Sequence, residues 1–370
     1  MKKLVFVSFF ALFFVTAIYS QTVKVNNGSN ASWRMLDKAE LEYDNGNLGE
    51  ALKFAENAKS LRRTEYQKAV SALEDATKPV VAQRAGDLIE DVYPLLKERM
   101  ELEAVNYIDL AVSRFGAEYF KSSVQNIKNY YRDHIVYPEA DYLIGKIFLS
   151  EGELDVAENY FDNALKNWQF LDIQSTKYYI LYDLAYLYSI KGDETGYEQS
   201  LLNIVKDNDD YLVNGEISSS LKSILRYAQK EKSPDKFFKL YRAGNYFSIK
   251  ACLKLADFYY EKNSPEKARY QSVLGVLSSF TRMNEILVMR NSKYAYNDLH
   301  SFFEEALRHS DVRDWIDDNN VWNGFYTFAL LMEEGGNKEF ASSIYQILSE
   351  LSLDPYVKNL SNTKNITVKS

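Results

Sequence analysis

The stretch from Tyr142 to Leu165, YLIGKIFLSEGELDVAENYFDNAL, carries the clearest structural pattern in the chain. Small residues recur in it at Gly145, Ala157 and Ala164, and large apolar residues stand between them. Small residues let two helices approach closely, while the large residues fill the space beside the contact. Gly152 stands where the chain must turn between the two helices. The stretch therefore predicts a pair of antiparallel helices.

The same arrangement of small and large residues returns along the chain. It is clearest over residues 138–170, 178–210, 249–280 and 322–355, and a weaker copy surrounds Ala39. Equivalent small residues in the first helix of each copy are separated by about one, two or three times 35 residues. One of the intervals is longer than a single repeat, because it includes a longer link between the helix pairs. This regular spacing predicts an array of helix pairs.

The pattern resembles the tetratricopeptide repeat, a helix pair of about 34 residues. The resemblance implies an all-α fold, an α-solenoid in which antiparallel helix pairs stack into a right-handed superhelix. We expect the repeat array to cover residues 32–355, with degenerate helix pairs in the gaps between the clear repeats. The segment Thr281–Asn320 is helical in pattern but carries no repeat signature. Ordinary helical hairpins without the superhelix are the alternative.

The two ends of the chain differ from the array. Residues 1–20 have a basic start and an apolar run that ends at a small residue, Ser20, which is the layout of a signal peptide cleaved at that point. An uncleaved membrane anchor is the alternative, although the apolar run is shorter than the roughly 20 residues that span a bilayer. We expect a disordered segment over residues 21–31 and a flexible tail over residues 356–370. The protein is then exported, to the periplasm or beyond the cell, and its mature chain does not span a membrane.

Composition narrows the class of protein. Of 370 residues, 46% are hydrophobic and 26% are charged, which is typical of a folded chain. The chain has only 15 Gly and 6 Pro. These low numbers argue against a sandwich or barrel, because those folds need many tight turns. A net charge of −8 gives no attraction to nucleic acid. The single cysteine, Cys252, excludes an internal disulfide.

The resemblance also implies a binding surface. In the family, the first helix of each pair lines an inner face that often holds a peptide of a partner protein. Carried over residue by residue, this groove consists of Tyr142, Lys146, Tyr179, Tyr182, Tyr186, Leu253, Asp257 and Tyr260. Tyr179, Tyr182 and Tyr186 lie three and four residues apart, so they share one helix face. Among 29 tyrosines, however, many must simply pack between helices.

The sequence carries no recognisable catalytic, metal-binding or cofactor-binding motif. The chain has three histidines, His134, His300 and His309, and none has the spacing of a zinc site. No nucleophile elbow, phosphate loop or dinucleotide-binding glycine pattern occurs. We therefore expect no catalytic residue, metal or cofactor, and a non-catalytic exported scaffold or adaptor that binds a partner protein and supports a cell-envelope assembly. A helical envelope enzyme acting on glycan or peptidoglycan and a self-assembling homo-oligomer are the alternatives.

Overall fold

The structure is a computed structural model, and it describes residues 31–77, 129, 132–207, 212–213 and 216–369. The expected signal peptide, the segment 21–30 and the degenerate helix pairs expected within residues 78–128 lie outside this range. Within the described ranges the fold is all-α, as predicted, and no helix there combines the length and the apolar character that a membrane span requires. The chain divides into two compact units, residues 1–174 and 175–370.

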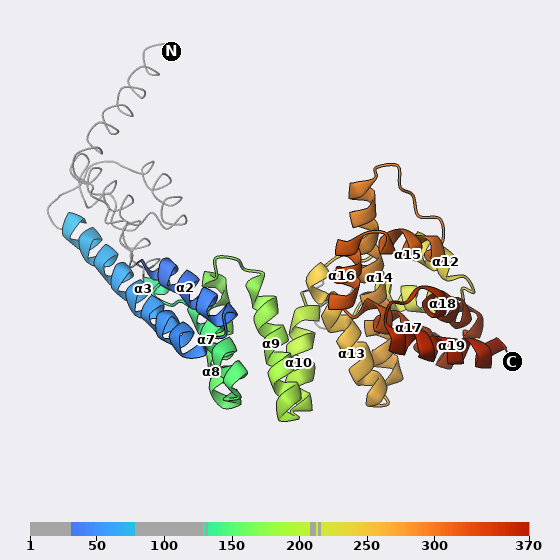
Figure 1. Ribbon diagram of the computed structural model, residues 1–370, viewed down its shortest axis with the longest axis horizontal. Coiled ribbons are helices and arrows are strands. Elements are labelled where there is room, and N and C mark those ends of the chain that lie inside the picture. The colour runs from blue at the N-terminus through green and yellow to red at the C-terminus, as the bar shows by residue number, and fades with distance from the viewer. Residues whose placement is uncertain (1–30, 78–128, 130–131, 208–211, 214–215, 370) are drawn as a thin grey trace, which may run out of the picture. The chain divides into compact units, whose positions relative to one another are not determined.

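The described residues of the first unit form two helical hairpins (Figure 1). The helices described there are α2 (Ser32–Asp44), α3 (Leu48–Thr77), α7 (Pro138–Glu151) and α8 (Leu154–Lys166), followed by the short 3-10 turn η2 (Trp168–Phe170). Helix α3 packs on both α2 and α7, so the hairpins stack in direct contact. Gly152 ends α7 with a φ of 81°, a left-handed backbone that glycine adopts without strain.

Small residues set the contacts inside these hairpins. Ala39 on α2 and Ala51, Ala55 and Ala58 on α3 are fully buried where the two helices meet. On α7, a Cβ built at Gly145 would lie 2.5 Å from the ring of Phe161 on α8, so only glycine admits that ring. The close approach predicted from the small residues is therefore present in both hairpins.

The second unit contains most of the helices that the structure describes. It consists of α9 (Thr176–Lys191), α10 (Glu194–Val205), α11 (Ser219–Ala228), α12 (Pro234–Leu240), η3 (Tyr246–Ser248), α13 (Ile249–Glu261), α14 (Pro265–Arg290), α15 (Leu299–Leu307), α16 (Ser310–Asp318), α17 (Val321–Glu334), α18 (Lys338–Leu351) and α19 (Pro355–Lys369). One short antiparallel pair, β1 (Leu212–Val213) with β2 (Glu216–Ile217), is the only sheet among the described residues.

Three hairpins of this unit stack directly on one another. They are α9–α10, α13–α14 and α17–α18, with α10 against α13 and α14 against α17. The gaps on either side of α13–α14, where degenerate helix pairs are expected to continue the array, contain α11–α12 and α15–α16. These helices do not continue the stack, because α10 contacts α13 and α14 contacts α17 directly. The inserted helices lie beside the stack instead: α11 and α15 pack on α14, while α12 and α15 pack on α18.

Phenylalanine rings explain why the inserted helices pack sideways. Phe237 and Phe238 on α12 and Phe302 and Phe303 on α15 are fully buried. Phe238 lies 5.0 Å from Phe280 of α14, and Phe302 lies 4.5 Å from the same ring, measured between ring centroids. Burial of such large rings stabilises the packing of α12 and α15 as a second layer against α14.

The C-terminal residues are also helical, so the flexible tail expected over residues 356–370 is wrong for residues 356–369. Helix α19 packs on α18, and Val357 is buried. Asp354 begins the helix by accepting hydrogen bonds from the backbone N–H groups of Tyr356 (2.8 Å) and Val357 (3.2 Å). Pro355 suits the first helical position, because its missing N–H needs no partner there.

Candidate functional site

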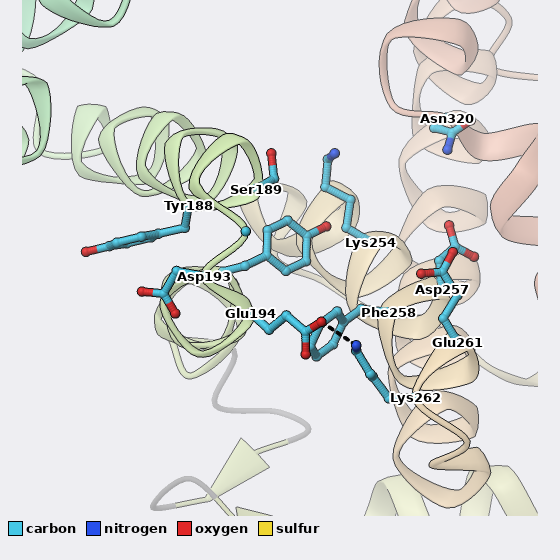
Figure 2. Close-up of a pocket in the computed structure, with 12 residues that line it drawn as sticks. Tyr188, Ser189, Asp193, Glu194, Lys254, Asp257, Phe258, Glu261, Lys262 and Asn320 are labelled. Atoms are coloured by element: carbon cyan, nitrogen blue, oxygen red, sulfur yellow. Dashed lines mark hydrogen bonds and ion pairs between the residues drawn. The ribbon is translucent and has the colours of Figure 1, made fainter. Parts of the chain in front are cut away.

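A cavity of about 450 Å³ opens in the second unit beside the turn that joins α9 to α10 (Figure 2). Gly192 ends α9 with a φ of 70° and lets the chain reverse. Asp193 then caps α10, because its carboxylate accepts hydrogen bonds from the backbone N–H groups of Thr195 (3.1 Å) and Gly196 (3.0 Å). One wall of the cavity is therefore a tight, well-capped turn.

Helix α13 supplies the facing wall. Lys254, Asp257, Phe258 and Glu261 follow the spacing of one helix face, and all four line the cavity. The opposite face of α13 is apolar and buried, with Cys252 among its residues. Because that buried face fixes the rotation of the helix, the polar residues point towards the cavity.

Asp257 is the most constrained side chain at the cavity. Its carboxylate accepts hydrogen bonds from the Nδ2 of Asn323 (2.8 Å) and the Oγ1 of Thr327 (2.6 Å), both on α17. Burial, together with the charge of Glu261, raises the pKa of Asp257 to about 6, and the two hydrogen bonds oppose that rise. The carboxylate is thus held in place by α17. Burial makes its ionisation less favourable than that of an exposed carboxylate.

The remaining charges leave the cavity acidic. Its lining holds four carboxylates, on Asp193, Glu194, Asp257 and Glu261, against the ammonium groups of two lysines. Lys262 already forms an ion pair with Glu194. Burial and the nearby Lys250 lower the pKa of Lys254 from its usual value. The carboxylates of the lining outnumber the lysines by four to two.

Three aromatic residues, Tyr188, Tyr197 and Phe258, also line the cavity. The centroids of Tyr197 on α10 and Phe258 on α13 lie 5.4 Å apart, with the rings tilted by 49°. Burial, followed by the charge of Asp257, raises the pKa of Tyr197 to about 12, so its hydroxyl stays protonated at neutral pH. The lining thus combines aromatic faces, a hydroxyl and carboxylates, a set suited to a cationic group and not to an anion.

The residues predicted for a partner groove occupy several environments. In the first unit, Tyr142 lies against Phe161 and Lys146 lies over the ring of Tyr43, 4.6 Å from its centroid. In the second unit, Tyr179 and Tyr186 are 55% and 59% exposed. These two remain candidates for contact with a partner. The single groove predicted for Tyr142 and the tyrosines of α9 stays a prediction.

Two predicted groove residues hold the fold together instead, so their assignment to an open surface is wrong. The hydroxyl of Tyr182 donates to the carbonyl of Phe247 (2.6 Å) and accepts from the N–H of Ala251 (2.9 Å), joining α9 to the start of α13. Leu253 is only 2% exposed. Its side chain fills the space left by Gly275 and Gly324, where an added Cβ would lie 2.6 Å from it.

The last two predicted groove residues lie on α13 and contact other side chains. Asp257 lines the cavity, as described above. Tyr260 donates a hydrogen bond to Glu334 of α17 (2.8 Å). Lys254, Phe258 and Glu261 of the lining were not predicted from the sequence, although the spacing of Lys254, Asp257 and Glu261 marks them as one polar face.

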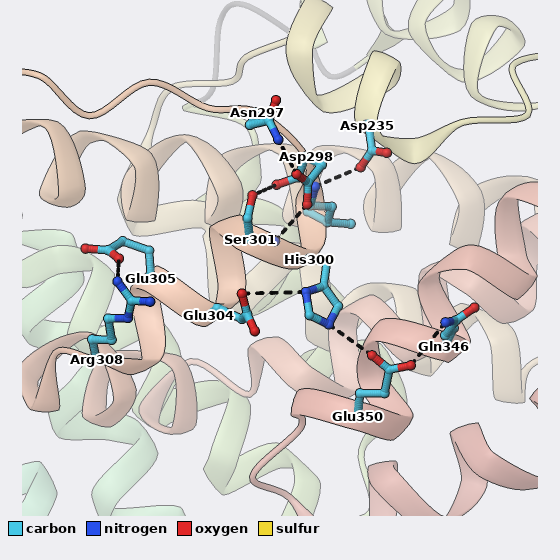
Figure 3. Close-up of polar contacts among 11 residues, drawn as sticks. Asp235, Asn297, Asp298, His300, Ser301, Glu304, Glu305, Arg308, Gln346 and Glu350 are labelled. Atoms are coloured by element: carbon cyan, nitrogen blue, oxygen red, sulfur yellow. Dashed lines mark hydrogen bonds and ion pairs between the residues drawn. The ribbon is translucent and has the colours of Figure 1, made fainter.

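A second polar cluster, at α15, has a structural role (Figure 3). Asp298 caps α15 by accepting from the N–H of Ser301 (2.8 Å). Asp235 of α12 accepts from the N–H of Leu299 (2.7 Å), and the Nε2 of His300 lies 2.9 Å from a carboxylate oxygen of Glu350 on α18. These contacts fasten the inserted helices to each other and to α18.

Comparison with known proteins adds one relative. No protein-family model matches the chain. An uncharacterized protein of Treponema pallidum (strain Nichols) is 26% identical over 318 residues, which is 86% of this chain and 85% of that protein. The similarity therefore spans nearly the whole length of both chains.

Proposed function

We propose that this protein is a non-catalytic, exported scaffold of the tetratricopeptide-repeat type that binds a partner protein in a cell-envelope assembly. The observation that carries the proposal is the direct stacking of α9–α10, α13–α14 and α17–α18. Each helix pair buries part of its apolar surface on the next pair, which is how repeat solenoids are stabilised. Stacks of this kind leave one face of each first helix free for binding.

Helix α9 supports the proposal through its surface. Tyr179, Tyr186 and Ile190 are 55%, 59% and 50% exposed, and their spacing of seven and four residues places them along one side of the helix. Tyrosine suits a binding surface because it offers a large contact area and a hydroxyl while losing little side-chain entropy. We therefore place the principal partner contact on this side of α9.

Crosslinking in intact cells tests the proposal. Cells would express either the native chain or the double variant Tyr179→Ala, Tyr186→Ala, and crosslinked partners would be identified by mass spectrometry. The matched control is Tyr356→Ala, since Tyr356 on α19 is 68% exposed and lies elsewhere on the second unit. We expect the double variant to lose a partner that the control retains.

Two results would count against this function. Equal capture by the double variant and the native chain would remove α9 as the contact surface. If the crosslinked species contained only copies of this chain, and light scattering of the purified protein gave a multiple of its mass, the protein would be a self-assembling component instead.

A further inference from the structure

We infer that the cavity between the α9–α10 turn and α13 receives an arginine side chain from an extended, basic segment of the partner protein. This inference rests on the proposed function, because it names the chemistry by which a bound partner is recognised. It concerns side chains other than Tyr179 and Tyr186, so the two can be tested separately.

Charge is the first argument. Among the described residues, no lysine or arginine lies within ion-pair distance of Asp257 or Glu261, whereas the other glutamate of the lining, Glu194, is paired with Lys262. Asp257 and Glu261 are one helical turn apart on α13, so their charges repel each other. A guanidinium placed between them would relieve this repulsion and could bond to both carboxylates.

The aromatic lining is the second argument. A guanidinium stacks on aromatic faces, and a cation over a ring is stabilised by about 0.5 to 2 kcal/mol, depending on how far it is desolvated. Lys262 already lies over the ring of Phe258, 5.9 Å from its centroid. The ring of Tyr197 is therefore the face that we assign to the incoming guanidinium.

Geometry is the third argument. The carboxylate of Asp257 is oriented before any ligand arrives, because Asn323 and Thr327 hold its two oxygens from α17. A pre-oriented acceptor loses less entropy on binding than a mobile one. The cavity of about 450 Å³ is also large enough for a side chain and part of its backbone, since small-ligand sites begin near about 300 Å³.

Lys254 opposes the binding of a cation, and it makes the inference testable in two directions. Its ammonium lines the same cavity, and its interaction with Asp257 is favourable. An incoming guanidinium must compete with this ammonium for Asp257. Removing the lysine charge should therefore strengthen binding, while removing a carboxylate should weaken it.

Fluorescence anisotropy on the purified full-length mature chain tests this. The probe is a fluorescein-labelled peptide of alternating arginine and glycine, and its control is the same peptide with citrulline, which keeps the shape of arginine without its charge. We expect the arginine peptide to bind about tenfold more tightly than the citrulline peptide. Glu261→Gln should weaken binding of the arginine peptide about threefold, and Lys254→Met should strengthen it by a similar factor.

Glu56→Gln is the matched control for Glu261→Gln. Both glutamates are exposed on helices, and each substitution removes one negative charge, but Glu56 lies on α3 in the first unit. Equal weakening by both variants would mean that the peptide responds only to net charge, and the inference would be wrong. Equal affinity for the two peptides, or no gain from Lys254→Met, would overturn it as well.

The two proposals fail in distinguishable ways. If the tyrosine variant loses its partner in cells while the arginine peptide shows no preference for the native cavity, the scaffold function stands and only the arginine pocket is wrong. If the peptide binds as expected but the tyrosine variant captures every partner, α9 is not the contact surface and the pocket stands on its own.

Discussion

Asp257→Asn should make the second unit less sensitive to rising pH. In the native chain, burial and Glu261 raise the pKa of Asp257 from 3.8 to about 6. The folded chain therefore holds this proton more tightly than the unfolded chain does. The resulting stabilisation is present at low pH and is lost as the pH rises through 6. An asparagine carries no titrating proton, so the variant should lack this loss.

The magnitude follows from the two pKa values. A difference of 2.2 pKa units between the folded value of about 6 and the ordinary value of 3.8 corresponds to about 3 kcal/mol when the carboxyl is fully ionised. Between about pH 5 and about pH 8, the linkage relation gives a loss of about 1.4 kcal/mol in the native chain. The stability of Asp257→Asn relative to the native chain should rise by that amount over this range.

Urea unfolding followed by tryptophan fluorescence measures this difference. Two of the four tryptophans, Trp33 and Trp168, lie in the first unit, so replacing both by phenylalanine leaves only the second unit reporting. The control is Asp314→Asn, because that carboxylate is exposed on α16. If the relative stability of Asp257→Asn were the same at both pH values, or changed in the opposite direction, our account of the Asp257 environment would be refuted.

Three further predictions concern packing. Gly145→Ala should destabilise the first unit by about 1–3 kcal/mol in urea unfolding, because its Cβ would lie 2.5 Å from the ring of Phe161. Gly49→Ala, which meets nothing within 4 Å, should not destabilise it. Leu253→Ala should cost about 2–5 kcal/mol by leaving a cavity beside α14 and α17, and a loss below about 0.5 kcal/mol would place this side chain outside the core. Cys252 should resist a thiol-specific reagent until the chain unfolds, because burial raises the pKa of its thiol to about 12, and rapid labelling of the folded protein would contradict this.

Local patterns determined the all-α class and many helix ends. A glycine such as Gly152 marks a turn because few other residues tolerate its positive φ, and this preference acts within a few neighbouring residues. Ala39 and Gly145 likewise mark close contacts, because only a small side chain lets two backbones approach. Such signals are short-range, so they can be found in a single chain without knowledge of the fold.

The order in which the hairpins stack and the position of the cavity depend on contacts between residues far apart in the chain. A gap of two repeat lengths fits a helix pair in the stack as well as one beside it, and the buried rings of Phe238 and Phe302 decide for the second arrangement. The resemblance to the tetratricopeptide repeat implies an open face for both Leu253 and Asp257, yet α17 covers the first and holds the second. The spacing of residues along one helix predicts which of them share a face. It does not predict which helix will cover that face, because the covering residues of α17 lie about 70 positions further along the chain.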